Sequence, residues 1–569
     1  MDLRHYIILG ICAVNAVVWG CPAQCQCKSS KIQCQELNEF PTGIPSTTSI
    51  LYIQQANISS LKPADMDAFS EALITFVVKN STIREVEPHT FDRAHNLMNL
   101  MLTGTGLVSL TEDLFQRLQL LTSLSLSDNK LNSLSSSILS PLQALKTLDL
   151  SINQFTSIPE RAFQGLIHLE KLMLQKNSIG ELKARTFDGL NKLKTLSLQH
   201  NNLKTLPGSA FEDLVNLEIL HLQNNGLTHL PAEIFAHQQK LTKLYLSNNQ
   251  LSSLPDGIFL NLPSLQQISL YVNNLQSLSP GIFGNLPLKD LWLYDNRLTK
   301  IEKNVFSNLT QVRLLVLSRN QISHVSPGAF NGLDELEEIS LHTNRLVTFE
   351  AGVFRGLPKL ANISLENNMI EDLPGELLDG VSHLFQLELQ NNSLPHLRQE
   401  VLDTLVNVDN VVLSKNPWKC DHDLLPLVEW LKKNTGKVKN ITSLTCSSPT
   451  HLANVSIINF TDAYLNQTPP PHITQNESLS PTEKWQKPHT PPPRKSTSAP
   501  SANSTSSSDK NNSSKDQREF EALSTNMHLI IIAVVCTVVI ISIIIFVVYW
   551  RRNKQGSQDL RHPKPNSVI

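Results

Sequence analysis

A repeat of 24 residues runs through most of this chain and limits the folds open to it. The pattern L-x-x-L-x-L-x-x-N-x-L recurs from about residue 48 to residue 418, and among the copies with Asn at the ninth position the step is 24 residues, except for one of 23 between Asn273 and Asn296. A single copy cannot bury its own apolar side chains, so the copies must stack into an array. Sixteen registers result: three early copies with Ala56, Ser81 and Thr105 at the ninth position, and Asn copies at residues 129, 153, 177, 201, 225, 249, 273, 296, 320, 344, 368, 392 and 416.

The spacing inside each copy predicts a short strand followed by a turn. The fourth and sixth residues point into the core, and the third, fifth and seventh residues point out, because side chains alternate along a strand. The buried Asn is expected to satisfy backbone groups where the chain leaves the strand. A Phe on the returning limb should stack with its equivalents as an aromatic spine: Phe69, Phe91, Phe115, Phe163, Phe187, Phe211, Phe235, Phe259, Phe283, Phe306, Phe330 and Phe354.

Two hydrophobic segments predict where the chain resides. Residues 1–20 have a basic start and a short apolar run, typical of a secretory signal peptide rather than an anchor. Residues 527–550 hold an uncharged apolar stretch long enough to cross a bilayer. Basic residues open the tail, 551–569, which favours a cytosolic C-terminus. We therefore expect a single-pass type I protein of the plasma membrane, with its N-terminus outside the cell.

The remaining segments are read from cysteines and composition. Residues 21–47 are expected to form a Cys-rich N-terminal cap, residues 48–415 about fifteen full repeats, and residues 416–464 a C-terminal cap in which Asp423 starts a helix. Residues 465–526, rich in Pro, Ser and Thr, are typical of an extended glycosylated stalk. An even number of exported cysteines favours disulfides over zinc, with Cys446 bonded to Cys420: Cys21, Cys25, Cys27, Cys34, Cys420 and Cys446.

The repeats and the cap segment 416–421, NPWKCD, resemble those of extracellular leucine-rich-repeat receptors. The resemblance implies an α/β leucine-rich-repeat solenoid, with a curved parallel sheet on its concave face and short 3-10, helical and turn segments on its convex side. It also implies the bridges Cys21–Cys27 and Cys25–Cys34. His422 departs from the common four-cysteine cap, which begins C-x-C. As partners the resemblance implies matrix glycoproteins such as collagen, fibronectin or laminin.

Glycosylation sequons leave a central part of the expected sheet open. No sequon falls on an outward strand position between about residues 97 and 346. Sugars at Asn57, Asn80, Asn362 and Asn391 are expected to cover the two ends of the concave sheet. The sequons predicted outside the stalk are Asn57, Asn80, Asn308, Asn362, Asn391, Asn440, Asn454 and Asn459, with Asn466 at its start.

Outward positions inside this window turn from small and polar to aromatic and apolar. Clustered exposed aromatics indicate a partner surface, and Trp, Tyr and Arg are enriched in binding hot spots. The alternative is that these rings only stack laterally and stabilise the strands. The predicted ligand-binding residues are His221, Tyr245, Tyr271, Trp292, Tyr294, Arg297, Val316 and Arg319.

The sequence gives little support for nucleic-acid binding, catalysis, metal binding or PDZ-domain binding. A net charge of −2 is not that of a nucleic-acid binder, and no catalytic or phosphate-binding motif is present. We therefore expect no enzyme activity and no cofactor. Residues 421–423, Asp-His-Asp, could bind a metal, but a solvated helix start is favoured. The C-terminal Ser567-Val568-Ile569 matches a PDZ ligand weakly, and a tail without this role is favoured.

These features together predict a cell-surface binding receptor. Its concave face would recognise a protein ligand in cell–matrix or cell–cell adhesion. Two alternatives stay open: a lateral co-receptor subunit of a membrane complex, and an innate recognition receptor without its own signalling domain.

Overall fold

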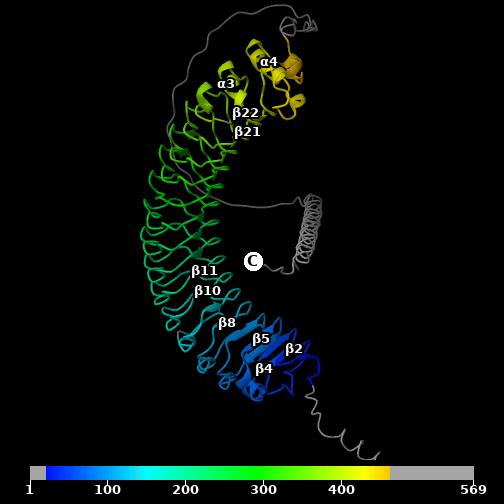
Figure 1. Ribbon diagram of the computed structural model, residues 1–569, viewed down its shortest axis with the longest axis vertical. Helices are drawn as coiled ribbons and strands as arrows, with labels where there is room; N and C mark the ends of the chain where they lie inside the picture. The colour runs from blue at the N-terminus through cyan, green and yellow to red at the C-terminus, as the bar shows by residue number, and fades with distance from the viewer. Residues whose placement is uncertain (1–20, 136, 383, 462–569) are drawn as a thin grey trace, which may run out of the picture. The chain divides into compact units, whose positions relative to one another are not determined.

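The computed structural model describes residues 21–135, 137–382 and 384–461, which form one curved array with its strands on the inner side (Figure 1). Residues 1–20, 465–526, 527–550 and 551–569, expected to be signal peptide, stalk, membrane span and tail, lie outside the described residues. Among the residues that are described, no helix has both the length and the apolar character needed to cross a membrane.

The concave face is an 18-stranded sheet. β1 (Cys25–Lys28) pairs antiparallel with β2 (Lys31–Gln35), and β2 starts a continuous parallel ladder. Sixteen further strands follow, one for each register expected from the sequence. They are β3 (Ile50–Gln54), β5 (Thr75–Lys79), β7 (Asn99–Thr103), β8 (Ser123–Ser125), β9 (Thr147–Asp149), β10 (Lys171–Met173), β11 (Thr195–Ser197), β12 (Ile219–His221), β13 (Lys243–Tyr245), β14 (Gln267–Ser269), β15 (Asp290–Trp292), β17 (Leu314–Val316), β19 (Glu338–Ser340), β20 (Asn362–Ser364), β21 (Leu384–Glu388) and β22 (Val408–Val412).

Equivalent residues of successive repeats face one another across the ladder. Lys171 pairs with Thr195, for example, and their central neighbours Leu172 and Leu196 are fully buried. The short step of 23 residues does not disturb this register, because Gln267 still pairs with Asp290. The missing residue is therefore absorbed in the return between β14 and β15, which contains no paired strand among the described residues.

The ninth-position asparagines bond the way the sequence predicts. Asn153 Nδ2 donates to the carbonyls of Leu126 and Leu150 at 2.9 and 3.2 Å, and its Oδ1 accepts from the Leu131 amide at 3.0 Å. The residue before each of these asparagines has a left-handed backbone, even at Ile152, where φ is 55°. Since a β-branched residue rarely adopts this conformation, the repeat imposes the turn on whatever residue stands there.

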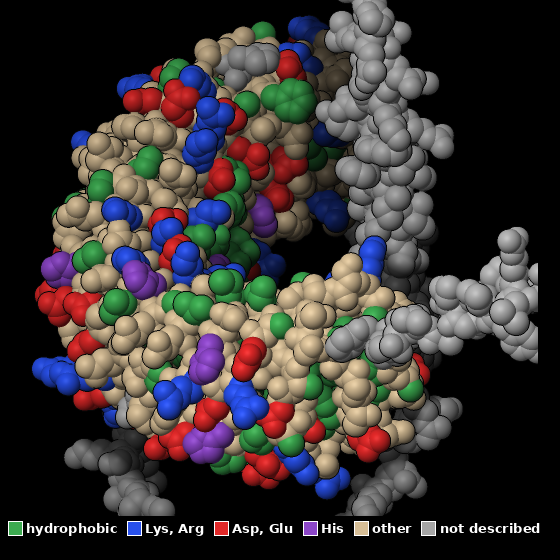
Figure 2. All heavy atoms as spheres, turned by 60° about the horizontal axis from the view of Figure 1, so that its bottom comes forward, with side chains coloured by type: hydrophobic (Ala, Val, Ile, Leu, Met, Phe, Trp, Pro, Cys, Tyr) green, Lys and Arg blue, Asp and Glu red, His purple; other side chains and the backbone are tan. Residues whose placement is uncertain are grey.

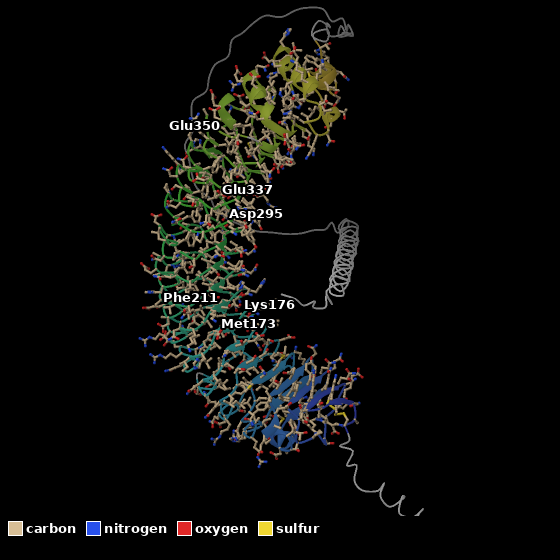
Figure 3. All side chains as sticks on the ribbon, in the orientation of Figure 1. Met173, Lys176, Phe211, Asp295, Glu337 and Glu350 are labelled. Atoms are coloured by element: carbon tan, nitrogen blue, oxygen red, sulfur yellow. A yellow bond between two sulfur atoms is a disulfide. The ribbon has the colours of Figure 1, made fainter. Side chains whose placement is uncertain are left out.

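The phenylalanine spine is confirmed in two runs, Phe163 to Phe211 and Phe235 to Phe354, whereas within the described residues Phe69, Phe91 and Phe115 do not stack on a repeat equivalent. Neighbouring rings stack in successive repeats, with centroids 6.0 Å apart for Phe163 and Phe187 and 5.8 Å apart for Phe330 and Phe354. These rings are fully or almost fully buried. Figure 3 shows Phe211 lying behind the sheet, whereas Met173 and Lys176 lie at the inner edge of the arc.

The convex side contains fewer helices than an α/β description implies. Most returns are turns, and the α-helices found in the described ranges are α2 (Pro63–Met66), α3 (Gln399–Thr404) and α4 (Leu425–Lys433). Two small parallel ladders occur instead, β4 (Asn57–Leu61) with β6 (Thr82–Val86) and β16 (Lys300–Ile301) with β18 (His324–Val325). The fold is thus a β-solenoid, because a return within a 24-residue repeat leaves little room for a helix.

Both ends of the array carry disulfide-bonded caps. The bridges are Cys21–Cys27, Cys25–Cys34 and Cys420–Cys446, as expected. At the C-terminal end, the Val411 amide donates to the Lys437 carbonyl at 2.8 Å, which covers the last strand.

The helix start in the C-terminal cap differs from the prediction. Asp421, not Asp423, is the capping residue, and it caps a short 3-10 turn, His422–Leu424, that leads into α4. The Asp423 amide is the donor in this cap, because the Asp421 side chain lies two residues upstream and faces it.

Candidate functional site

The predicted ligand-binding side chains lie on or just after five neighbouring strands of the sheet, β12, β13, β14, β15 and β17. Fifth-position side chains line up across the ladder, where His221 pairs with Tyr245, Tyr245 with Ser269, Ser269 with Trp292, and Trp292 with Val316. Tyr271 and Tyr294 occupy the seventh position, two residues further along their strands. All of these apolar and aromatic side chains are half-buried. We call this surface the aromatic stripe: His221, Tyr245, Tyr271, Trp292, Tyr294 and Val316.

Four rings of the aromatic stripe stack in pairs on rings of neighbouring strands. His221 stacks on Tyr245 and Tyr271 on Tyr294, each with ring centroids 4.6 Å apart and nearly parallel planes. Burial lowers the pKa of His221, against a hydrogen bond from Gln223 that raises it, so the ring that stacks is neutral at pH 7. Lateral stacking, the alternative reading of these residues, therefore accounts for some of their contact.

Trp292 does not stack on a neighbouring ring of the aromatic stripe. Its fifth-position neighbours are Ser269 and Val316, and the indole makes no ring contact or hydrogen bond with any other residue in the described ranges. The indole therefore retains an apolar face and a free donor. These are the two features that a large interface side chain offers to a partner.

The two arginines predicted for the site differ in their surroundings. Arg319 Nε lies 2.7 Å from Asp295 Oδ1 and is largely exposed. Arg297 is also exposed but follows the turn after β15, so it stands at the side of the sheet rather than on a strand. Figure 3 shows Asp295 at the inner side of the arc, so the Arg319–Asp295 pair borders the aromatic stripe.

A cluster of ionisable groups follows the aromatic stripe toward the C-terminal cap. His342 Nδ1 lies 3.9 Å from Glu366 Oε1. Burial, together with the neighbouring Glu388, raises the pKa of Glu366 to about 7. Burial also favours the neutral form of His342 and so lowers its pKa. We call these three residues the acidic cluster.

The acidic cluster is not among the site residues predicted from the sequence. A signal was available, because His342 and Glu366 are 24 residues apart and both stand at the seventh position. Figure 2 shows acidic side chains beside apolar ones on the inner surface of the curve.

The sequons fall at several kinds of position. Asn362 lies on β20 and Asn391 follows β21, both at the C-terminal end of the sheet. At the other end only Asn80 borders a concave strand, because Asn57 begins β4 of the convex ladder. Asn308 is on the return, where its Nδ2 donates to the Phe283 carbonyl at 3.3 Å. Asn440, Asn454 and Asn459 lie in the C-terminal cap, and Asn466 lies outside the described residues.

The aspartates of the C-terminal cap could be mistaken for a metal site. His396, Asp421 and Asp423 have ligand atoms close together. Both oxygens of Asp421 already have partners, however, with His396 Nε2 at 2.7 Å and Lys419 Nζ at 2.8 Å. Although burial raises it, these contacts together lower the pKa of Asp421. Asp421 is thus already engaged by an imidazole and an ammonium group, which favours the structural role.

These features define a class of protein: a capped repeat solenoid with an open concave sheet. The family model for the leucine rich repeat matches the chain at residues 95–155, 143–203, 191–251, 239–288, 287–346, 315–370 and 334–394. The matches cover residues 95–394, more than half of the chain, so the chain belongs to the leucine-rich-repeat family. The matched model describes a repeat scaffold and not a catalytic family.

Relatives and solved structures agree with this assignment. Mouse Nephrocan is 35% identical over 96 residues, which cover 17% of this chain and 19% of Nephrocan. Mouse leucine-rich repeat-containing protein 52 is 37% identical over 73 residues, which cover 12% of this chain and 23% of that protein. The chain thus spans about a fifth of the length of each relative.

Two solved structures share the fold. A leucine-rich-repeat protein of Leptospira interrogans has a TM-score of 0.50 and 28% identity, covering 66% of this chain and 91% of that one. A chain of the Drosophila Toll–Spatzle complex has a TM-score of 0.52 and 19% identity, covering 77% of this chain and 75% of that one.

Proposed function

We propose that this chain is a single-pass type I receptor of the plasma membrane that binds an extracellular protein ligand on its concave face. The observation that carries the proposal is Trp292, half-buried on the aromatic stripe with an indole that contacts no other ring in the described residues. The membrane location is supported by the apolar character of residues 1–20 and 527–550.

The proposed role is cell–matrix or cell–cell adhesion. The repeat and cap residues resemble leucine-rich repeat-containing protein 15 and, in layout, platelet glycoprotein V. That resemblance supports matrix glycoproteins of the collagen, fibronectin or laminin class as ligands. The solved complex of Toll with Spatzle supports protein binding more generally, since it involves the same fold. A PDZ partner for Ser567-Val568-Ile569 stays a prediction, and these residues lie outside the described ranges.

The test is direct binding of the full-length chain, purified in mild detergent, to surfaces coated with collagen, fibronectin or laminin. The double variant Trp292→Ala/Tyr294→Ala should bind at least about tenfold more weakly, because each substitution removes a large apolar contact. Its melting temperature should change little, since both side chains point away from the core.

A matched control comes from the same face. Met173 is a half-buried fifth-position residue on β10, outside the aromatic stripe, so Met173→Ala should bind like the wild type. If the double variant bound as tightly as Met173→Ala, the aromatic stripe would not be the site. Binding of the wild type to none of the three coatings would overturn the matrix-ligand class.

A further inference from the structure

The acidic cluster contains one carboxyl oxygen for which the described part of the protein supplies no hydrogen-bond donor, although His342 lies near the other oxygen of the same group and Glu388 interacts with it. Glu366 Oε2 is buried and makes no hydrogen bond to any residue of the described ranges. Its neighbour Glu388 is well supported, since Ser364 Oγ donates to one oxygen at 3.1 Å and Gln386 Nε2 to the other at 2.6 Å. An unpaired buried acceptor destabilises the fold, which a donor brought by a ligand would relieve.

Glu366 is one of a group of such acceptors. Five seventh-position side chains on the concave face have a buried oxygen with no partner in the described part of the chain. Two precede the aromatic stripe, one stands beside its first member His221, and two follow it, and every one is an acceptor. The five residues are Gln175, Gln199, Gln223, Glu366 and Gln390.

The charges near Glu366 do not neutralise it. Asp295 is paired with Arg319, but neither Glu366 nor Glu388 forms an ion pair with a Lys or Arg of the described residues. Glu338 on the neighbouring strand β19 adds a further exposed carboxylate. A cation does lie beyond β21, where Lys439 Nζ is 3.4 Å from Gln386 Oε1. The ionisable groups around Glu366 are therefore His342 on one side, with Arg319 and Asp295 beyond it, and Glu388 with the more distant Lys439 on the other. Glu338 pairs with Asn362, further from Glu366.

We infer that the concave face between β14 and β21 binds a cationic polypeptide segment, which places an apolar or aromatic side chain on Trp292 and a Lys or Arg side chain at Glu366 and Glu388. This inference rests on the proposed function and specifies the chemistry of its ligand. Charge complementarity supports it, because the acidic cluster lacks a cationic partner of its own. The unpartnered oxygens of Glu366 and Gln390, the two of the five that lie at this end of the face, also support it, because an ammonium or guanidinium group carries only donors.

The strand spacing sets the geometry of the segment. Three strand steps separate β15 from β20 and four separate it from β21, with about 4.8 Å for each step. The cation should thus stand roughly 14–19 Å from the aromatic anchor. An extended chain crossing the strands covers this distance in about four to six residues.

The same geometry couples binding to protons. Burial raises the pKa of Glu366 to about 7, so at pH 6 the group is mostly neutral. A bound cation favours the ionised carboxylate, so binding releases a proton and the affinity should rise as the pH increases from 6 to 8. Protonation of His342, whose pKa burial lowers, adds positive charge only at lower pH.

The experiment pans a phage-displayed library of random 12-residue peptides on the full-length chain in mild detergent at pH 7.4. Sequences enriched on the wild type should combine an aromatic or apolar residue with Lys or Arg about four to six residues away. On Glu366→Gln/Glu388→Gln the basic residue should no longer be enriched while the apolar residue still is. The enriched peptide, made synthetically, should bind this variant about tenfold more weakly than the wild type.

Titration completes the test. Affinity for the synthetic peptide should increase severalfold between pH 6 and pH 8 for the wild type and for His342→Ala, and stay nearly constant for Glu366→Gln/Glu388→Gln. Enriched peptides without basic residues, or equal binding by wild type and Glu366→Gln/Glu388→Gln, would overturn the inference and leave the proposed function standing. The proposed function fails separately if Trp292→Ala/Tyr294→Ala enriches the same peptides as the wild type.

Discussion

In the thirteen repeats with Asn at the ninth position, a single asparagine side chain holds the strand to the turn that follows it. Asn249 Nδ2 donates to the carbonyls of Leu222 and Leu246, both at 3.0 Å, and its Oδ1 accepts from the Leu227 amide at 3.1 Å. One side chain thus satisfies backbone groups of two consecutive repeats. An apolar residue of similar size cannot replace it, because these backbone groups are buried.

Asn249→Ala should therefore destabilise the array locally. Each buried group left without a partner costs about 1–3 kcal/mol. Because a solenoid couples mainly to its nearest neighbours, amide exchange should accelerate in β12, β13 and β14 and change little in β20. Gln250→Ala is the control, since Gln250 is exposed and makes no side-chain bond in the described structure. Equal exchange in both variants would show that the asparagine bonds contribute nothing.

At the scale of elements, the convex returns pack closely enough for single atoms to matter. Gly332 and Gly356 occupy the same position after Phe330 and Phe354, with φ of 83° and 82°. A Cβ on Gly332 would overlap the Ser307 carbonyl oxygen of the preceding repeat, whereas a Cβ on Gly356 would meet nothing within 4 Å. The two glycines thus share a backbone requirement and differ in packing.

The variant Gly332→Ala should consequently lose more stability than Gly356→Ala. Both pay for a left-handed backbone, about 1–2 kcal/mol, and only the first must also displace a neighbouring repeat. The melting temperature of the full-length chain, measured by differential scanning calorimetry for both variants, gives the comparison. Identical decreases in melting temperature for the two variants would mean that neighbouring returns can move apart without loss of stability.

The elements also show how far the sequence could predict the molecule. The strands and their register follow from a period of two inside a period of 24, and these predictions are confirmed, as is the phenylalanine spine from Phe163 to Phe211 and from Phe235 to Phe354. The ladder of β16 with β18 was not predicted, because the returns carry no alternation. The raised pKa of Glu366 could not be predicted either. It depends on burial and on Glu388 of the neighbouring strand, and the linear sequence pattern shows neither of these.

At the scale of the whole array, stability depends on its two covered ends. The C-terminal cap joins Cys420 to Cys446 across a separation of 26 residues and buries Trp418. An uncovered end would expose the apolar core of the last repeat to water.

Removing this bridge should open the array from one end. Cys420→Ser/Cys446→Ser releases a loop closure worth about 3–4 kcal/mol. Amide exchange should accelerate first in β22 and then in β21, while β8 and β9 stay protected. The N-terminal bridges are intact in this variant and serve as the internal control. Uniform acceleration along the array would contradict the nearest-neighbour picture.

The alternation of buried and outward residues has a practical consequence for engineering. Leu244 and Leu246 are fully buried, whereas Lys243 and Tyr245 between and beside them face outward. Within one short strand, the outward residues are thus available for recognition and the buried residues maintain the fold. A designer can randomise the outward residues of a few adjacent strands, select for binding to a new target, and leave the buried core residues unchanged.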